Sequence, residues 1–193
     1  MKSKGTGYGR ALARRAIVAI AVLVWPCTMM AADVPVSVQL NLYQKIWKLD
    51  RSLNGRTELV VAVLYQETYA ASSDARAAVM IWAEASGVRC VFVALDQKTA
   101  EAALQTVLAD VFYVTPMRGA DIEQIARIAR ARQIRTMAGL TEYLLIGLSV
   151  GIGVRNDRPR IMINLAAAKA EGAAYQAQLL QMAEIVKARS AVR

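Results

Sequence analysis

Three apolar segments, each followed by a helical pattern, constrain the fold of this 193-residue chain more than any other feature. Residues 58–65 (ELVVAVLY) form a continuous apolar run rich in valine, and residues 88–95 and 111–115 repeat the pattern. Continuous runs of this length predict strands buried on both faces, as in a parallel sheet. Parallel strands need long crossover connections, which the intervening helical segments supply as right-handed βα units. We therefore expect an α/β fold of three layers, with a mostly parallel sheet between helices.

The helical segments have apolar side chains at helical spacing and recognisable ends. A helix over residues 36–53 is expected to end at Asn54-Gly55 and to bury Val36, Leu40, Tyr43, Trp47 and Leu53. The next helix has capping oxygens at Ser72, Ser73 and Asp74 and a stop at Gly87. Further helices are expected over residues 98–109, with Ala100, Leu104 and Leu108 on one face, and over residues 121–133. A short fourth strand is expected over residues 134–138.

The C-terminal part departs from the βα pattern. Residues 149–155 and 160–165 are strand-like runs separated by the turn residues 156–159 (NDRP), which predicts an antiparallel hairpin. A closing helix is expected over residues 174–188, with Leu179, Met182, Ala183 and Val186 toward the body of the protein. The sequence has no internal repeat and no linker, so residues 33–193 are expected to form a single domain with one core.

The first 32 residues have the composition of a secretory signal peptide. The segment has no acidic residue, an apolar run over residues 16–25, small residues at its end, and the basic residues Lys2, Lys4, Arg10, Arg14 and Arg15. The apolar run is too short for a membrane anchor, because crossing the hydrocarbon needs about 20 residues. We therefore expect residues 1–32 to be cleaved and the mature protein to lie in the periplasm.

Composition argues against several classes of function. The chain has no histidine, which removes the commonest general base and the commonest metal ligand. Five of its 24 basic residues lie in the leader, so the net charge of +9 falls to +4 after cleavage. This surplus includes no run of Lys or Arg, so nucleic-acid binding is not expected. Four arginines at helical spacing are expected on a solvated face: Arg127, Arg130, Arg132 and Arg135.

No sequence motif indicates catalysis. Only Cys90 remains after cleavage, so the mature chain cannot form an internal disulfide, and its apolar strand context favours a buried hydrophobe over a reactive thiol. Gly147, Gly151 and Gly153 precede or lie inside a strand where a phosphate loop would open a helix, so they predict close packing or a bulge. The carboxylates are scattered along the chain. We expect no enzymatic activity, no catalytic residue, no metal and no cofactor.

Residues 147–186 (GLSVGIGVRNDRPRIMINLAAAKAEGAAYQAQLLQMAEIV) resemble the end of the YfiR-type periplasmic repressor family (YfiR/HmsC-like). The similarity rests on a glycine-bearing strand, a polar turn, and a second strand that ends at Ile163-Asn164-Leu165. It continues through an alanine- and lysine-containing segment with Gly172 into a closing helix with Leu179-Leu180 and Ala183. The leader, the first amphipathic helix and the βα units agree in order, so the resemblance covers most of the mature chain.

The resemblance implies a regulator. Proteins similar to this chain restrain an inner-membrane diguanylate cyclase by binding its periplasmic sensor domain, and release raises cyclic di-GMP and favours biofilm formation. An outer-membrane lipoprotein of the peptidoglycan-binding type often relieves this restraint. Relatives can carry disulfides that hold the fold, whereas this chain keeps only Cys90. Redox control through an internal disulfide is therefore not expected, and a homodimer linked through Cys90 is the pairing left open.

Two binding modes point to different residues. Exposed aromatic and apolar side chains anchor protein interfaces, and the candidates for contact with the cyclase are Tyr43, Tyr65, Tyr69, Tyr143 and Leu144, while Trp47 and Leu145 are better explained as core. A small ligand would collect at the carboxyl ends of the strands, where the candidates are Gln66, Glu67, Asp96, Thr115 and Met117, with Thr68 and Gln97 beside them. The alternative function is therefore a ligand-sensing accessory domain for another envelope receptor or histidine kinase.

Overall fold

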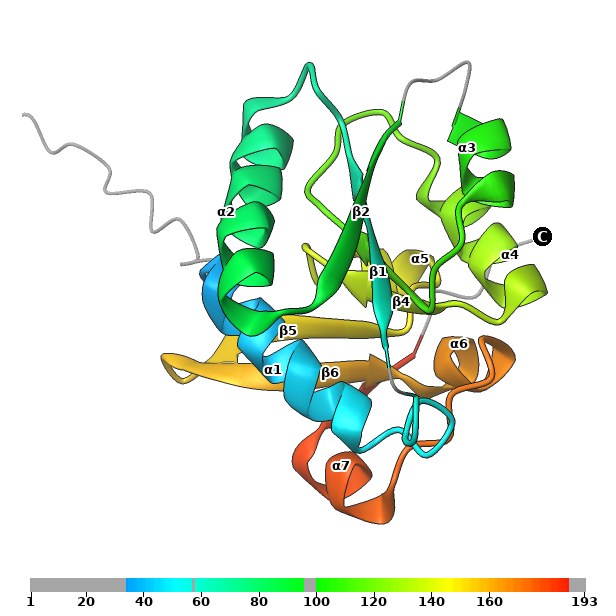
Figure 1. Cartoon of the computed structure of the whole chain (residues 1–193). Coiled ribbons are helices and arrows are strands. Elements are labelled where there is room, and N and C mark those ends of the chain that lie inside the picture. The colour runs from blue at the N-terminus through cyan, green and yellow to red at the C-terminus, as the bar shows by residue number, and fades with distance from the viewer. Residues whose placement is uncertain (1–33, 57, 96–99, 188–193) are drawn as a thin grey trace, which may run out of the picture. The chain divides into compact units, whose positions relative to one another are not determined.

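A seven-stranded sheet runs through residues 34–56, 58–95 and 100–187, which are the residues that the computed structural model describes (Figure 1). The strands lie in the order β2-β1-β3-β4-β5-β6-β7, and every neighbouring pair is parallel except β5 and β6. Their bounds are β1 (Val60–Tyr65), β2 (Arg89–Ala94), β3 (Val111–Val114), β4 (Arg135–Ala138), β5 (Val150–Arg155), β6 (Arg158–Asn164) and β7 (Glu184–Val186). The predicted α/β class is confirmed.

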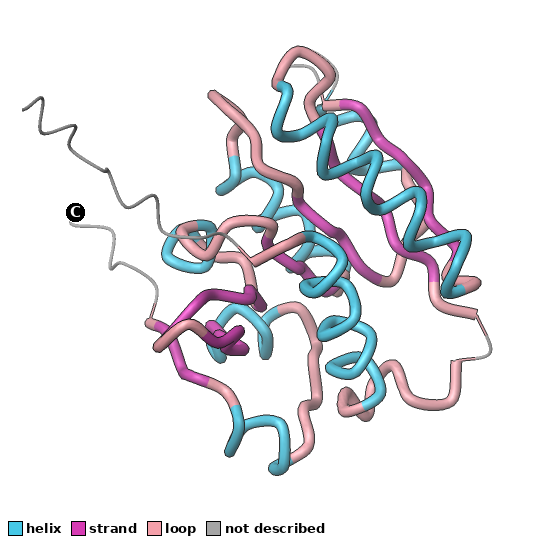
Figure 2. The backbone as a smooth tube through the Cα atoms, turned by 90° about the vertical axis from the view of Figure 1, so that its left-hand side faces the viewer, coloured by secondary structure: helices cyan, strands magenta, loops and turns pink. Residues whose placement is uncertain are grey.

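Helices cover both faces of the sheet. α1 (Val36–Lys48) and α2 (Ala70–Ser86) pack on one face, and α3 (Ala100–Thr106), α4 (Ile122–Arg132) and α5 (Tyr143–Ile146) cover the other. Figure 2, viewed from the side of α2, shows β1 and β2 behind that helix. Two short helices, α6 (Leu165–Ala170) and α7 (Ala177–Met182), follow the hairpin. None of the helices in the described ranges is long and apolar enough to cross a membrane.

β1 is central because its side chains alternate between the two cores. Val61 and Val63 belong to the core under α1 and α2, whereas Ala62 and Leu64 belong to the core under α3 and α4. All four side chains are fully buried. This double burial is the physical reason for the continuous apolar run, and β3 and β4 are buried along their lengths in the same way.

β2 is an edge strand, so the prediction that residues 88–95 are buried on both faces is wrong. Arg89 and Ala94 are exposed, and the four residues between them are half-buried. Cys90 is therefore half-buried, not buried as predicted. The apolar pattern is misleading here because α2 covers one face of this edge strand. Phe92 of β2 packs in the same cluster as Val79 and Trp82 of α2.

Two helices begin or end at residues other than those predicted, because polar side chains near these ends bond to other groups. α1 ends at Lys48 and not near residue 53, because the carboxylate of Asp50 accepts hydrogen bonds from the backbone and the hydroxyl of Ser52. α2 begins at Ala70, since the hydroxyl of Ser72 accepts a hydrogen bond from the Gln66 backbone N–H at 2.8 Å and does not cap the helix. Its end at Gly87 is as predicted, with φ of 70°.

The helix predicted over residues 98–109 is shorter than expected and spans Ala100–Thr106. Leu104 is fully buried as predicted, but Leu108 lies beyond the helix end and is 81% exposed. The fourth helix is close to its predicted position, with the carboxylate of Asp121 accepting a hydrogen bond from the Gln124 backbone N–H. The hairpin is also confirmed, and its turn consists of Asn156 and Asp157, both with positive φ, as a type I′ turn requires.

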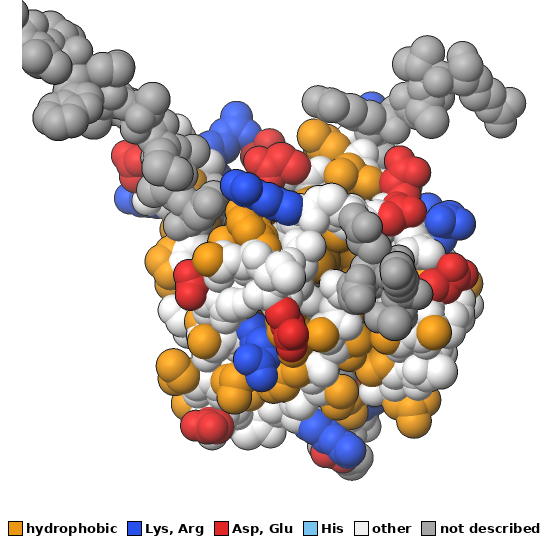
Figure 3. Space-filling view, turned by 90° about the horizontal axis from the view of Figure 1, so that it is seen from above, with side chains coloured by type: hydrophobic (Ala, Val, Ile, Leu, Met, Phe, Trp, Pro, Cys, Tyr) orange, Lys and Arg blue, Asp and Glu red, His pale blue; other side chains and the backbone are white. Residues whose placement is uncertain are grey.

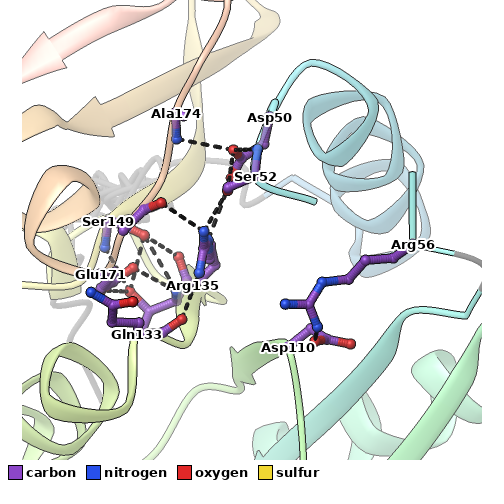
Figure 4. A network of polar contacts seen from close by, with 11 residues as sticks. Asp50, Ser52, Arg56, Asp110, Gln133, Arg135, Ser149, Glu171 and Ala174 are labelled. Atoms are coloured by element: carbon purple, nitrogen blue, oxygen red, sulfur yellow. Dashed lines mark hydrogen bonds and ion pairs between the residues drawn. The ribbon is translucent and has the colours of Figure 1, made fainter. Parts of the chain in front are cut away.

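The helix predicted over residues 174–188 is wrong in extent. The backbone N–H of Ala174 donates to Asp50, and the N–H of Gln176 donates to the Leu49 carbonyl, so the chain here is tied to the end of α1 (Figure 4). Only Ala177–Met182 is helical, and the next residues form β7 beside β6. Leu179 is fully buried as predicted, but Met182 is 46% exposed.

Of the four arginines predicted on a solvated face, only Arg127 is exposed. Arg130 donates to the Gly147 carbonyl, and Arg132 donates to the carbonyls of Leu104 and Val107. Arg135 is buried and pairs with Asp50 at 3.4 Å. These side chains hold loops in place because guanidinium groups can donate to several carbonyls at once.

Candidate functional site

Aromatic rings and arginine side chains meet at the carboxyl end of β1, where the strand gives way to α2. Tyr65 is the last residue of β1, and the guanidinium carbon of Arg76 in α2 lies 4.9 Å from the centre of its ring. The same guanidinium lies 5.5 Å from the ring of Phe92 in β2. A cation held over two aromatic faces is attracted by both ring quadrupoles, so this arginine is fixed in position at the rim.

A second pair of a ring and an arginine lies at the same edge of the sheet. The guanidinium carbon of Arg118, in the loop after β3, lies 4.8 Å from the ring of Tyr69, the residue before α2. The backbone N–H of Arg118 donates to the side-chain oxygen of Gln66 at 3.0 Å, which joins the loops after β1 and β3. Arg118 is exposed and Tyr69 is half-buried. We call Tyr65, Tyr69, Arg76, Phe92 and Arg118 the aromatic rim.

A cavity of about 530 Å³ opens beside the aromatic rim. Its wall combines the loop after β1 with the end of β2, α3 and the start of α4, and its lining residues are Gln66, Glu67, Thr68, Ala94, Leu95, Ala100, Leu104, Gly119, Ala120, Asp121, Gln124 and Ile125. The hydroxyl of Tyr65 donates to Glu67 at 3.3 Å, so a hydrogen bond links the rim to the cavity wall. Figure 3 views this side of the molecule and shows acidic, basic and apolar side chains interspersed.

The predicted ligand edge is only partly assembled at this cavity. Gln66 and Glu67 line it, and Thr68 lies with them. Thr115 is fully buried, and its hydroxyl is satisfied there by donating to the Leu64 carbonyl at 2.9 Å and by a hydrogen bond with the Ser72 hydroxyl. Met117 is 9% exposed and packs into the core under α3 and α4. Asp96 and Gln97 lie outside the described residues.

Four of the five predicted contact residues, Tyr43, Tyr65, Tyr143 and Leu144, are buried, which corrects the expectation that they are exposed, and Tyr69 is half-buried. Tyr43 is fully buried, and its hydroxyl donates to the Ala138 carbonyl at 2.7 Å. Burial raises the pKa of Tyr43 well above its ordinary value, so it stays protonated. Leu144 is also fully buried, and Tyr143 accepts a hydrogen bond from the Met117 backbone at 2.9 Å. Trp47 is in the core, as expected.

The two arginines of the aromatic rim are not among the residues predicted from the sequence. Arg76 lies on α2 and Arg118 in the loop after β3, and neither has a periodicity that would single it out. The signal that could have indicated them is the clustering of parallel strand ends, which brings the loops after β1 and β3 to one edge. Tyr65 and Tyr69 were predicted at this edge, and they lie there beside the two arginines.

The described residues contain no arrangement that we recognise as catalytic. Their Cys, Asp and Glu side chains form no group of three that could hold a metal ion. Burial raises the pKa of the Cys90 thiol to about 11, which leaves it protonated near neutral pH. The arrangement at the rim is suited to binding, since rings and guanidinium groups offer large contact areas with directed donors.

Comparisons with known proteins agree with the fold. A family model described as YfiR/HmsC-like matches residues 50–184. No curated protein sequence matches the chain. The solved structures to which the chain is similar have low sequence identity, so they show the fold alone.

The first is a conserved domain protein from Vibrio cholerae, with a TM-score of 0.63, 16% identity, and coverage of 79% of this chain and 60% of that one. The second is the ligand-free, open form of a substrate-binding protein with adhesive properties from Clostridium difficile, with a TM-score of 0.66, 16% identity, and coverage of 81% and 61%. The third is an ABC domain in complex with L-Trp from Streptococcus pneumoniae, with a TM-score of 0.62, 13% identity, and coverage of 79% and 60%. The chain thus spans about three fifths of the length of each.

Proposed function

Because this chain belongs to the YfiR/HmsC-like family, we propose that it represses an inner-membrane diguanylate cyclase by binding the periplasmic sensor domain of that enzyme. At the level of the family, the chain is a periplasmic regulator of cyclic di-GMP signalling. The finer proposal includes export through the cleavable leader, residues 1–32, which lie outside the described residues. Binding would stabilise one conformation of the cyclase, which is all that repression requires thermodynamically.

The aromatic rim is the observation that carries the proposed contact. Tyr and Arg are enriched among the residues that dominate binding energy at protein interfaces. Here two such pairs occur at one edge of the sheet, and their rings and guanidinium groups are already held in place by each other. Pre-positioned side chains lose less entropy on binding. Among the residues predicted from the sequence, Tyr69 therefore remains as a contact residue. Tyr65 is only 7% exposed and supports the rim by holding Arg76, whereas the buried Tyr43, Tyr143 and Leu144 leave the proposal.

The test is a binding measurement between the purified protein and the periplasmic domain of a cyclase encoded beside its gene. Tyr69→Ala and Arg118→Ala should each weaken binding at least about 30-fold, which corresponds to about 2 kcal/mol for a dominant interface residue. Arg127→Ala is the matched control, because Arg127 is exposed on α4 and forms only a 4.0 Å contact with Asp121. Unchanged affinity in both rim variants, or an equal loss in the control, would exclude the rim as the contact surface.

Two further partners belong to the same proposal. An outer-membrane lipoprotein of the peptidoglycan-binding type would compete with the cyclase for this protein and relieve repression. A homodimer is the other association, and sedimentation of the purified protein with and without a reductant would show whether Cys90 takes part in it. A dimer that persists in reductant would rely on non-covalent contacts alone.

Ligand sensing is a second candidate function, favoured by the cavity beside the rim. Its volume of about 530 Å³ lies in the range of roughly 300–1,000 Å³ typical of small-molecule sites. The Tyr65–Glu67 hydrogen bond would let an occupant of the cavity alter the rim. A metabolite screen by thermal shift tests this, since a ligand at about 100 times its Kd stabilises the folded state by about 2.7 kcal/mol. A ligand whose shift is unchanged in Glu67→Gln and Gln124→Ala would bind elsewhere.

A further inference from the structure

Side chains replace part of the backbone ladder where β4 meets β5. The two strands share only two residue pairs, Met137 with Val150 and Ala138 with Gly151. One residue earlier, the backbone N–H of Thr136 donates to the carboxylate of Glu171 at 2.8 Å and its hydroxyl donates to the same carboxylate at 2.7 Å. The backbone N–H of Ser149 donates to the Thr136 hydroxyl at 2.7 Å (Figure 4). This side-chain cluster joins the two parts of the sheet.

Glu171 enters this cluster from the loop after α6 and is fully buried. From α4, Arg130 faces it, but that guanidinium donates to the Gly147 carbonyl, and its Nε has no partner among the described residues. From β4, Arg135 is already paired with Asp50, which lies in the loop after α1. From the loop before α7, the buried hydroxyl of Tyr175 faces the cluster. No arginine or lysine within the described ranges forms an ion pair with Glu171.

The segment that follows Glu171 has few other anchors. Within residues 171–186, all of which are described, Leu179 is the only apolar side chain in the buried class. The other apolar contacts are made by half-buried side chains, and β7 pairs with β6 over three residues. Hydrogen bonds complete the attachment, from Ala174 to Asp50, from Arg135 to the Gly172 carbonyl, and from Gln176 to the Leu49 carbonyl. Segments with few buried apolar contacts open at lower free energy than the core.

We propose that Glu171 is a proton-operated latch, which keeps residues 171–186 docked against β4, β6 and the loop after α1 while its carboxyl group is protonated and favours opening when the proton is lost. The docked state has hydrogen-bond partners for the neutral acid, because the Thr136 hydroxyl can accept its proton while donating to Ser149, 3.2 Å away. The ionised carboxylate of Glu171 accepts hydrogen bonds from two donors of Thr136 but forms no ion pair. In a buried site, the ionised form therefore costs more free energy than the neutral acid.

The pH range in which the latch acts follows from burial. Desolvation raises the pKa of Glu171 from 4.5 to about 7 in the docked state, and water restores the ordinary value when the segment opens. Within this window, each pH unit makes opening about tenfold more favourable, and above it the effect levels off. Docking is therefore tightest in acid and loosens toward neutral pH. The proposal does not depend on the identity of the partner.

Hydrogen exchange measured by mass spectrometry tests the latch in the purified protein. After correction for intrinsic exchange rates, protection of peptides within residues 171–186 should fall about 70-fold between about pH 5 and about pH 8, given the two pKa values. Peptides of α2 (Ala70–Ser86) provide the internal reference and should not follow this change. In Glu171→Gln, which is isosteric and neutral at every pH, protection of the segment should be high and constant.

Glu123→Gln is the control variant, because Glu123 is exposed on α4, and it should behave as the wild type. The latch is refuted if protection of the wild-type segment is the same at both pH values, a result that needs no variant to fold. It is also refuted if Glu171→Gln retains the pH dependence, since another group would then be responsible. A parallel loss of protection in α2 would mean global unfolding and would likewise exclude a local latch.

Discussion

Removing the carboxylate of Asp50 should destabilise the protein strongly, because it leaves a buried arginine without a counter-charge. Asp50 is 1% exposed and Arg135 is 8% exposed, and their closest atoms are 3.4 Å apart. The same carboxylate accepts hydrogen bonds from the backbone of Ser52 and of Ala174, each at 3.0 Å. Asp50→Ala therefore removes one ion pair and leaves two backbone donors without that acceptor.

The expected loss is about 4 kcal/mol, within the roughly 3–5 kcal/mol found when one partner of a buried pair is removed. That is a large share of the roughly 5–15 kcal/mol that holds a typical domain folded. Asp50→Asn keeps an oxygen for the backbone donors and removes only the charge, so it should cost less. The double variant Asp50→Ala/Arg135→Met removes the isolated charge, and it should recover about 2 kcal/mol relative to Asp50→Ala.

Urea unfolding followed by tryptophan fluorescence measures these differences. Trp47 and Trp82 lie in the core with ring centres 6.2 Å apart, so their emission should report loss of packing around α1 and α2. The slope of the free energy with urea should be the same in all variants, which would justify comparing the midpoints. The reasoning is refuted if the double variant is no more stable than Asp50→Ala, because burying Arg135 without its counter-charge would then cost no stability.

Three other predictions concern the sheet and its titratable groups. Gly151→Ala should lower the free energy of unfolding in urea by about 1–3 kcal/mol, because the new Cβ would lie 2.6 Å from a methyl of the buried Leu144. Gly153→Ala should lower it less, since its Cβ would lie 2.8 Å from the sulfur of the flexible Met162 side chain. Cys90, with its pKa raised to about 11, should react with a thiol reagent near neutral pH about 100-fold more slowly in the folded protein than in urea, and equal rates would contradict its half-buried position. Because the pKa of Glu171 is raised, its stabilising contribution is complete below pH 4.5 and is lost as pH rises to about 7. Relative to Glu171→Gln, the wild type should lose about 3 kcal/mol of unfolding free energy across this window. Parallel curves of stability against pH for the two proteins would contradict the raised pKa.

The central strands and the hairpin could be predicted because local pattern and tertiary burial agree there. β1 lies between two cores, so nearly every side chain is apolar, and the turn at Asn156 and Asp157 uses residues that tolerate positive φ. The edge position of β2 could not be predicted, since its residues 90–94 (CVFVA) form an apolar run like that of β1. Strand order depends on long-range pairing, which periodicity does not encode.

The C-terminal segment could not be predicted for a related reason. Residues 174–188 have helical periodicity, but the backbone of Ala174 is held by Asp50, which is 124 residues earlier in the chain. The candidate site shows the same limit, because Tyr65 could be placed at a strand end from the sequence. Arg76 becomes part of the site only because the fold brings α2 beside the rings of Tyr65 and Phe92. Side-chain partners across such separations are set by the fold and not by local spacing.

The two parts of the sheet are joined in physically different ways, and this difference bears on regulation. β1, β3 and β4 are buried on both faces by apolar side chains, so separating them would expose much of the core. β4 and β5 share two residue pairs, and polar side chains that can exchange protons or partners complete the junction. A fully satisfied polar network fixes one arrangement, but loss of a single partner weakens it steeply. In a chain whose described residues contain no disulfide, the polar junction is therefore where a small chemical change can alter the conformation at the least cost in stability.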